Sequence, residues 1–232
     1  MKGLSSIWKT SFLIFSFLFV YACLSAKFVP LPPKLVIGIY HPVNKGETLW
    51  RICKTYDVDL QEVAELNNIK DATQIEAGDK IFIPGATKVK KVKVFKKEPT
   101  KKNVKIVLPK GKFSWPIQGK VVSYFGVRKG RKYDGIDIRA PLGLPVKAAD
   151  SGKVVFADRL SGYGNIIILK HKNKYTTVYA HNKVNLVKEG RWVKRGSVIA
   201  KVGNSHNPAI SPTLHFQIRR YNKARNPLFY LP

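Results

Sequence analysis

From Phe113 to the end of the chain, apolar and polar residues alternate over short runs that are separated by glycine-containing turns. Runs such as KVVSYFG, GNIIILKH and LHFQIR have the two-residue period of half-buried strands, and segments with helical periodicity are nearly absent. The residues HKNK at 171–174 are typical of a hairpin turn. This pattern predicts an all-β domain of antiparallel sheets over residues 113–232.

A different pattern occupies residues 40–84, where a short strand at 40–44 and a closing strand at 80–84 flank two helical segments. In the first segment Leu49, Ile52, Cys53 and Tyr56 follow i, i+3, i+4 and i+7 spacing, which predicts one buried helix face. In the second, Asp59 and Glu62 have capping-box spacing. We expect a compact β-α-α-β unit with Cys53 in its core and with His41 on its surface.

The N-terminus has the pattern of an export signal. Two lysines precede the apolar run SFLIFSFLFVYA, which has the length of a signal-peptide core and is too short to span a bilayer well. The run ends in VYAC, which resembles the cleavage box of bacterial lipoproteins and predicts that residues 1–22 are removed and that Cys23 is lipidated; ordinary cleavage and an uncleaved anchor are the alternatives. Proline-containing residues 23–39 are then expected to form a tether.

The charge is strongly positive, with 42 basic against 14 acidic residues and a net charge of +28. Residues 85–112 alone hold eleven lysines and one glutamate, which predicts a basic linker between the two domains. Such charge attracts polyanions in general, including nucleic acid, anionic lipid and cell-wall polymer. Because the chain is expected to be exported and has no nucleic-acid recognition motif, we do not expect it to bind nucleic acid.

The stretches GETLWRICKTYDVDLQEVAELN and IEAGDKIFIP resemble a LysM domain, the module that binds glycans containing N-acetylglucosamine. The resemblance covers residues 40–84. It implies a shallow sugar-binding groove between the turn before the first helix and the loop after the second. The glycan-binding residues that it implies are Gly46, Glu47, Thr48, Ile69 and Gln74.

The stretches DGIDIRAPLGLPVKAADSGKVV, YTTVYAH, VKRGSVIAKVGNS and PTLHFQIR resemble, in order, the signature blocks of lysostaphin-type (LytM-like) zinc metallopeptidases, which cut peptide cross-links of peptidoglycan. The resemblance places the three zinc ligands at Tyr133, Asp137 and His215. It places the two assisting histidines at His181 and Thr213. Tyrosine and threonine thus replace two of the four histidines that the family has at these five positions.

These two replacements argue against catalysis. A phenol has an ordinary pKa near 10 and is a poor zinc ligand at neutral pH, and a threonine cannot exchange a proton near pH 7 as an imidazole does. We therefore expect no catalytic residue, no metal and no cofactor, and a domain that binds a partner in an open groove lined by these five residues. Residual zinc binding by Asp137, His181 and His215 stays an alternative. His171 and His206, in a hairpin turn and a loop, are expected to be solvated.

The combination of lipoprotein signal, LysM domain, basic linker and altered peptidase domain resembles the NlpD-type murein hydrolase activators. The resemblance implies a non-catalytic envelope lipoprotein that binds peptidoglycan and a periplasmic amidase, is held at the membrane by a lipid anchor, and faces the periplasm. Leu24 after Cys23 is typical of sorting to the outer membrane. A zinc endopeptidase with a modified site and a tether between outer membrane and peptidoglycan are the alternatives.

Overall fold

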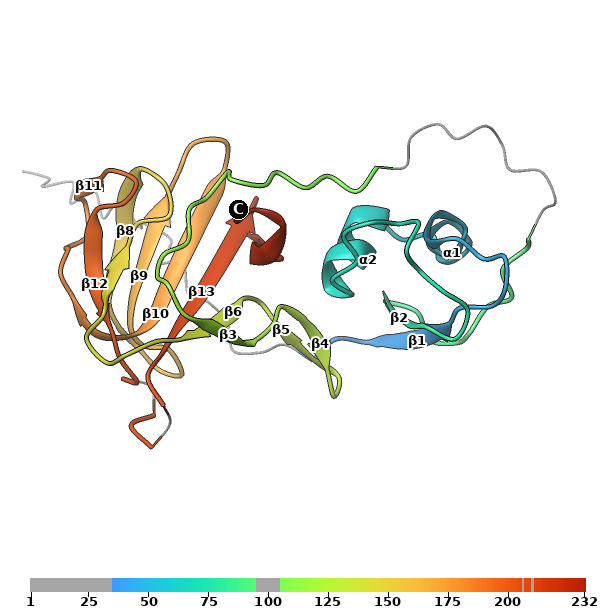
Figure 1. Cartoon of the computed structure of the whole chain (residues 1–232), viewed down its shortest axis with the longest axis horizontal. Helices are drawn as coiled ribbons and strands as arrows, with labels where there is room; N and C mark the ends of the chain where they lie inside the picture. The colour runs from blue at the N-terminus through green and yellow to red at the C-terminus, as the bar shows by residue number, and fades with distance from the viewer. Residues whose placement is uncertain (1–34, 95–104, 206, 210) are drawn as a thin grey trace, which may run out of the picture.

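A computed structural model describes residues 35–94, 105–205, 207–209 and 211–232. The expected signal segment, Cys23 and most of the expected tether lie outside the described residues, as does His206. The chain forms a small N-terminal domain with two helices and a larger C-terminal domain built from strands, which confirms the mainly β fold class (Figure 1). In the described part of the chain, neither α-helix has the length and apolarity needed to cross a membrane.

The N-terminal domain has the expected β-α-α-β order, with β1 (Gly38–Pro42), α1 (Leu49–Tyr56), α2 (Leu60–Leu66) and β2 (Lys80–Pro84). Strands β1 and β2 pair antiparallel. The side chain of Thr48 caps α1, and the Asp59 side chain accepts a hydrogen bond from Glu62 N at 2.7 Å at the start of α2. Cys53 is 2% exposed in the core, as expected. Burial raises the pKa of its thiol to about 12, so the thiol is protonated and unreactive at neutral pH.

The C-terminal domain contains one large antiparallel sheet with strand order β11-β8-β9-β10-β13-β6-β3, in which β12 also pairs with β10 and β7, and β14 pairs with β13. A separate hairpin is formed by β4 and β5. The chain order is β3 (Lys120–Ser123), β4 (Gly126–Arg128), β5 (Arg131–Tyr133), β6 (Ile136–Arg139), β7 (Pro145–Lys147), β8 (Gly152–Leu160), β9 (Gly164–Lys170), β10 (Tyr175–Asn185), β11 (Trp192–Val193), β12 (Val198–Val202), β13 (Thr213–Arg220), β14 (Lys223–Arg225) and the 3-10 helix η1 (Pro227–Phe229).

Alternation along β13 and β6 separates the two faces of this sheet. Leu214, Phe216 and Ile218 point into the main core and are fully buried, together with Ile136 and Ile138 of β6. The residues between them, at odd-numbered positions of β13, point to the opposite face. Thr213, His215 and Gln217 of β13 therefore lie on one face of the sheet, with the hydrophobic core behind them.

The described parts of residues 85–112 are packed more closely than their charge suggested. Val92 is 5% exposed and belongs to the core of the N-terminal domain, while Ile106 packs against the cores of both domains. Val107 N donates to Gln61 Oε1 at 2.8 Å, and Gln61 Nε2 donates to Val107 O at 3.1 Å. The scattered valines and isoleucine of this lysine-rich segment therefore attach it to the domains that it joins.

Two histidines that were expected to be solvated are buried. His41 is 1% exposed and lies between Tyr56 Oη and Glu47 Oε2, each 2.9 Å from one ring nitrogen. His171 is 7% exposed, with Nδ1 2.8 Å from Ser151 O and Nε2 2.7 Å from Thr177 Oγ1. The hairpin turn at 171–174 is present, with positive φ at Asn173 and Lys174, but the His171 ring is turned inward. The expectation of a surface position was wrong for both residues because no local pattern specifies the polar partners that hold them, which lie 6 to 20 residues away.

Candidate functional site

Local strand geometry brings together four of the five residues that the peptidase resemblance singled out. Thr213 and His215 are two residues apart on β13, so their side chains point to the same face. His215 is paired with Asp137 of β6. His181 lies in an irregularity of β10, where the register to β9 shifts between Tyr179 and Asn182, and its φ is +67°. A bulge of this kind re-aims a side chain. It places the His181 ring 5.5 Å from that of His215, and we call these residues, with Asp137 and Thr213, the Asp137–His215 cluster.

An aligned chain of hydrogen bonds runs through this cluster. His215 Nδ1 lies 2.6 Å from Asp137 Oδ1, and His215 Nε2 lies 2.9 Å from Gln217 Nε2. Since the amide nitrogen of Gln217 can only donate, Nε2 of the ring accepts and Nδ1 carries the proton. Arg219 Nη1 donates to Gln217 Oε1 at 3.0 Å and to Asp134 Oδ2 at 3.2 Å.

The electrostatic surroundings keep Asp137 ionised. Burial raises the pKa of its carboxyl, but the hydrogen bond from His215, the nearby rings of His215 and His181, and a hydrogen bond from Ser123 together hold the pKa below its usual value. The two side chains of the pair are partly exposed, Asp137 at 29% and His215 at 17%. The cluster thus presents a carboxylate and an imidazole, both partly exposed, at a surface that solvent and a partner can reach.

Tyr133, the fifth residue, lies at the end of hairpin β4–β5 and is covered by a cation. The guanidinium carbon of Arg128 is 3.8 Å from the centre of the Tyr133 ring. Arg128 is held there by bonds from Nη1 to Tyr124 O at 2.8 Å and from Nη2 to Ser123 Oγ at 2.9 Å. Because Ser123 also bonds to Asp137, the Arg128–Tyr133 stack is linked to the cluster by one side chain.

The donor chemistry of the cluster differs from that of a zinc site. A cation at Asp137 and His215 would have to displace the bond between them, and the other nitrogen of His215 is engaged by Gln217. The guanidinium of Arg128 lies over the Tyr133 ring and adds a positive charge at the position where the resembled family has a ligand histidine. In the described residues, no group of three or more His, Cys, Asp or Glu side chains is arranged to hold a metal ion.

Several residues of this site were missed by sequence reasoning. Gln217 and Arg219 follow His215 at two-residue spacing on β13, so strand alternation would have placed them on the same face. Tyr163, whose ring contacts that of His215 in an edge-to-face manner at 5.8 Å, and Arg128 are brought in by tertiary structure and have no such signal. Burial raises the pKa of Tyr163, so its hydroxyl is protonated near neutral pH.

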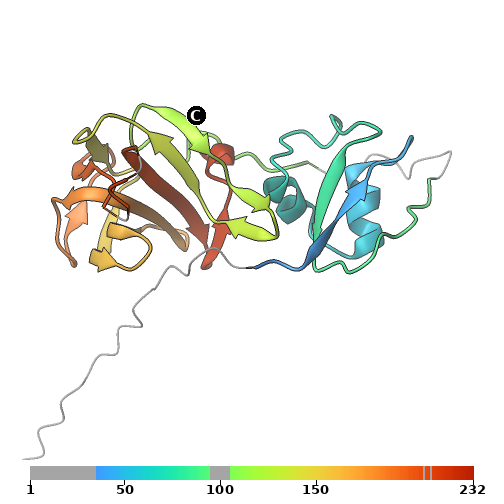
Figure 2. The same ribbon diagram turned by 90° about the horizontal axis from the view of Figure 1, so that it is seen from below.

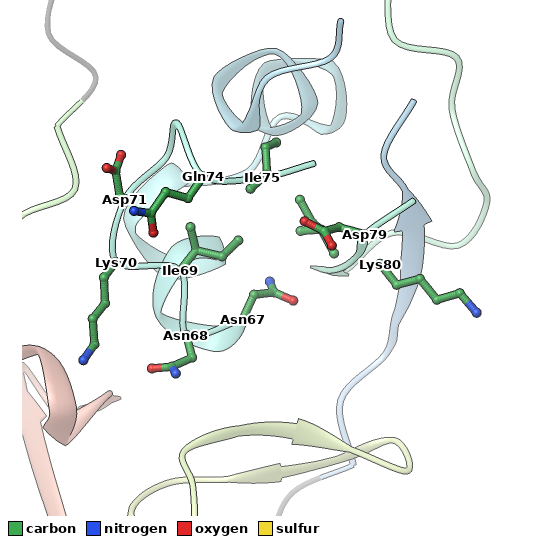
Figure 3. A pocket seen from close by; sticks show the side chains of 10 residues that line it. Asn67, Asn68, Ile69, Lys70, Asp71, Gln74, Ile75, Asp79 and Lys80 are labelled. Carbon is green, nitrogen blue, oxygen red and sulfur yellow. The ribbon is translucent and has the colours of Figure 1, made fainter. Parts of the chain in front are cut away.

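The expected glycan-binding residues of the N-terminal domain fall into two groups. Ile69 and Gln74 line a pocket of about 530 Å³ between the end of α2 and the start of β2 (Figure 3). The remaining lining residues are Asn67, Asn68, Lys70, Asp71, Ile75, Asp79, Lys80 and Ile81. Apolar side chains at the centre and polar groups around them are a common composition for a sugar-binding pocket.

The other three expected glycan-binding residues lie at the turn before α1 and do not line this pocket. Glu47 is 8% exposed and accepts from the backbone and side chain of Asn44 as well as approaching His41. Burial raises the pKa of Glu47, but these hydrogen bonds outweigh it and lower the pKa overall. Thr48 caps α1, and Gly46 has a φ of +84°. The structure therefore gives Glu47 and Thr48 structural partners within the turn.

A second pocket, of about 670 Å³, lies in the C-terminal domain between residues 115–119 and 144–147. Trp115, Ile117 and Leu144 are among its lining residues. None of the residues of the Asp137–His215 cluster lines either of these two pockets.

Comparison with known proteins matches both domains. Residues 41–84 match the LysM domain, and residues 131–227 match peptidase family M23. The chain is 39% identical to lipoprotein YgeR of Escherichia coli, over 84% of this chain and 82% of that protein, and 32% identical to outer membrane antigenic lipoprotein B of Histophilus somni, over 84% of this chain and 69% of that protein. It is 44% identical to the murein hydrolase activator NlpD of Escherichia coli over 53% of this chain, a match that spans 32% of that protein. The chain therefore has a LysM domain and a peptidase family M23 domain, and it belongs to the same family as lipoprotein YgeR and outer membrane antigenic lipoprotein B.

Proposed function

We propose that this protein is a non-catalytic envelope lipoprotein that binds peptidoglycan and activates a partner murein hydrolase, an N-acetylmuramoyl-L-alanine amidase, in cell-wall remodelling or cell separation. The observation that carries the proposal is the Asp137–His215 cluster, whose carboxylate and imidazole are bonded to each other and to Ser123 and Gln217. Such a surface suits recognition of a partner better than activation of water. The similarity to the murein hydrolase activator NlpD of Escherichia coli also supports a role as an activator.

The activation that we propose is a shift of populations in the partner. An activator favours the active form of an amidase only to the extent that it binds this form more tightly than the inactive one. A hundredfold activation requires about 2.7 kcal/mol of such preference. The exposed part of Asp137, together with Arg128 and the Tyr133 ring, offers charge-assisted hydrogen bonds and an aromatic contact that can supply it.

We assign peptidoglycan binding to the LysM domain and no metal to the peptidase-like domain. The pocket beside Ile69 and Gln74 suits a neutral amide-bearing sugar, with isoleucines for its methyl groups and with Asn, Gln, Asp and Lys side chains for its hydroxyl and amide groups. We further propose that Cys23 carries a lipid and that the protein faces the periplasm from the outer membrane. Similarity to proteins named as lipoproteins supports the anchor.

The activation proposal is tested by digestion of isolated sacculi with candidate amidases from the same genome, with and without this protein. We expect no release of fragments by this protein alone, with or without added zinc, and at least about tenfold faster release when a cognate amidase is present. Asp137→Asn is expected to remove most of the stimulation, whereas the exposed Asp158→Asn on β8 is a matched control that retains it. Muropeptides with newly cut cross-links from this protein plus zinc would instead favour the endopeptidase alternative.

The glycan assignment is tested by sedimentation of the protein with insoluble peptidoglycan. We expect Gln74→Ala combined with Lys70→Ala to reduce the pelleted fraction, while Glu76→Ala, in the same loop but outside the pocket, leaves it unchanged. Equal sedimentation of all three proteins would contradict the assignment. A protein that sediments but stimulates no amidase, and whose loss detaches membrane from wall, would favour the tether alternative.

A further inference from the structure

Hairpin β4–β5, which carries Arg128 and Tyr133, is not part of the large sheet. Its three residue pairs join only the two strands to each other, from Gly126↔Tyr133 to Arg128↔Arg131. An isolated two-stranded hairpin is marginally stable in water and needs packing against another element. What holds this hairpin therefore decides where the Arg128–Tyr133 stack lies.

The LysM domain supplies much of that packing. The hairpin projects from the peptidase-like domain toward the LysM domain, where it lies beside α2 and β1 (Figures 1 and 2). Val36 N, in the segment just before β1, donates to Gly130 O at 3.0 Å, and Tyr40 Oη of β1 donates to Val127 O at 3.3 Å. Phe125 is 5% exposed in an apolar cluster that the two domains share, with Leu66 and Phe82 from the LysM side. At Gly126, φ is +130° and a Cβ would lie 2.6 Å from Leu66 O, so the strand backbone and the end of α2 are in direct contact.

A buried polar network ties α2 to the end of β14 and the residue that follows it in the peptidase-like domain. Glu65 is 2% exposed; its carboxylate accepts from Arg225 Nη2 at 2.8 Å and from Asn226 N at 3.1 Å. Asn226 is 1% exposed, and its side-chain nitrogen lies 3.1 Å from Glu65 O and 3.2 Å from Asn68 Oδ1. Removal of one partner of a buried charged network leaves the other without compensation, which is costly. These bonds therefore fix the position of α2 over the peptidase-like domain.

We infer that the LysM domain is a structural part of the partner-binding site: α2, held by Glu65 and Asn226, braces hairpin β4–β5 and keeps the Arg128–Tyr133 stack against Ser123 and the Asp137–His215 cluster. The chemistry at the interface permits this brace to be released. The interface combines the apolar cluster of Leu66, Phe82 and Phe125 with charged and amide hydrogen bonds, and water can replace these hydrogen bonds when the domains separate. Separation of the domains therefore changes the shape and charge of the site without unfolding either domain. This inference does not depend on which partner the site binds.

The test uses the full chain with Glu65→Ala and Asn226→Ala combined, followed by backbone hydrogen exchange. We expect the amides of β4 and β5 to exchange at least about tenfold faster, while β2 of the LysM domain and β9 and β10 of the large sheet keep their protection. Small-angle X-ray scattering is expected to show a larger radius of gyration. The side-chain protons of Arg128 lie over an aromatic ring, so their ring-current shifts in NMR spectra are expected to move toward random-coil values.

Glu62→Ala is the matched control, because it removes the same type of side chain from the same helix, outside the contacts described above. It is expected to change none of the three measurements. Two results would overturn the inference: a hairpin that stays protected with an unchanged Arg128 signal although scattering shows separated domains, or a double variant in which the domains stay docked. The first would show that the hairpin needs no brace, and the second that Glu65 and Asn226 do not hold it.

Discussion

The two domains each contain a carboxylate bonded to an imidazole, and the two pairs differ in exposure. In the LysM domain, Glu47 Oε2 lies 2.9 Å from His41 Nε2, and the side chains are 3% and 1% exposed. In the peptidase-like domain, Asp137 Oδ1 lies 2.6 Å from His215 Nδ1, and the side chains of Asp137 and His215 are 29% and 17% exposed. The first pair is enclosed by its own turn and helix, while the second lies on the outer face of a sheet.

The difference separates a structural pair from one available for recognition. The remaining bonds of the Glu47 and His41 pair go to Asn44 and to Tyr56 Oη, which in turn accepts from Lys90 N at 2.8 Å. They connect the turn before α1 to the segment that follows β2. The Asp137 and His215 pair is itself partly exposed, and its other partners are Ser123 and the buried side chain of Gln217. A partner can add to the second network but has no access to the first.

The largest loss of stability is expected from Glu47→Ala. It leaves a buried imidazole and the backbone N–H of Asn44 without their acceptor, so the free energy of unfolding of the LysM domain is expected to fall by about 3 kcal/mol. Chemical denaturation followed through a LysM-domain probe measures it. Glu76→Ala, at an exposed position, is the control and is expected to stay within about 0.5 kcal/mol of the original protein. A loss of glycan binding with unchanged stability would instead make Glu47 a ligand-binding residue.

A smaller effect on stability is expected from Asp137→Asn. The pair is partly exposed and water can replace the lost charge, so the free energy of unfolding of the peptidase-like domain is expected to fall by about 1 kcal/mol or less. The same denaturation experiment, with a probe in that domain, checks it. A loss as large as that from Glu47→Ala would erase the distinction between the two pairs.

The smallest effect is a pH dependence that comes from His171, a buried histidine without a carboxylate partner. Burial lowers its pKa from the ordinary value of 6.5. The unfolded chain therefore binds the proton first as pH falls through about 6.5, and the free energy of unfolding decreases until the pH passes below the folded-state pKa. We expect the thermal midpoint of the peptidase-like domain to fall across this range, and His171→Gln to flatten the fall. An unchanged slope in the variant would show that another group titrates.

The elements of the fold were predictable where a period or a cap specified them. Helix α1 was predicted from the buried face of Leu49, Ile52, Cys53 and Tyr56, and helix α2 from its Asp59 cap. The strands after Phe113 were predicted from the alternation of apolar and polar residues. His41 and His171 were placed wrongly because a single histidine carries no information about what will cover it. The hydrogen-bond acceptors of these rings lie 6 to 20 residues away in sequence.

Sequence by itself determined the order of the two domains and the lysine-rich segment between them. It also determined that Tyr133 and Thr213 stand where the resembled family has histidine. Each of these features is a property of residue type and spacing. Only the tertiary structure decided that His215 is engaged on both ring nitrogens, that Arg128 covers Tyr133, and that the LysM domain packs on the hairpin that carries them. These contacts join segments up to about 160 residues apart, as Glu65 and Asn226 do. Local periodicity has no information about such pairs, which depend on how whole domains pack.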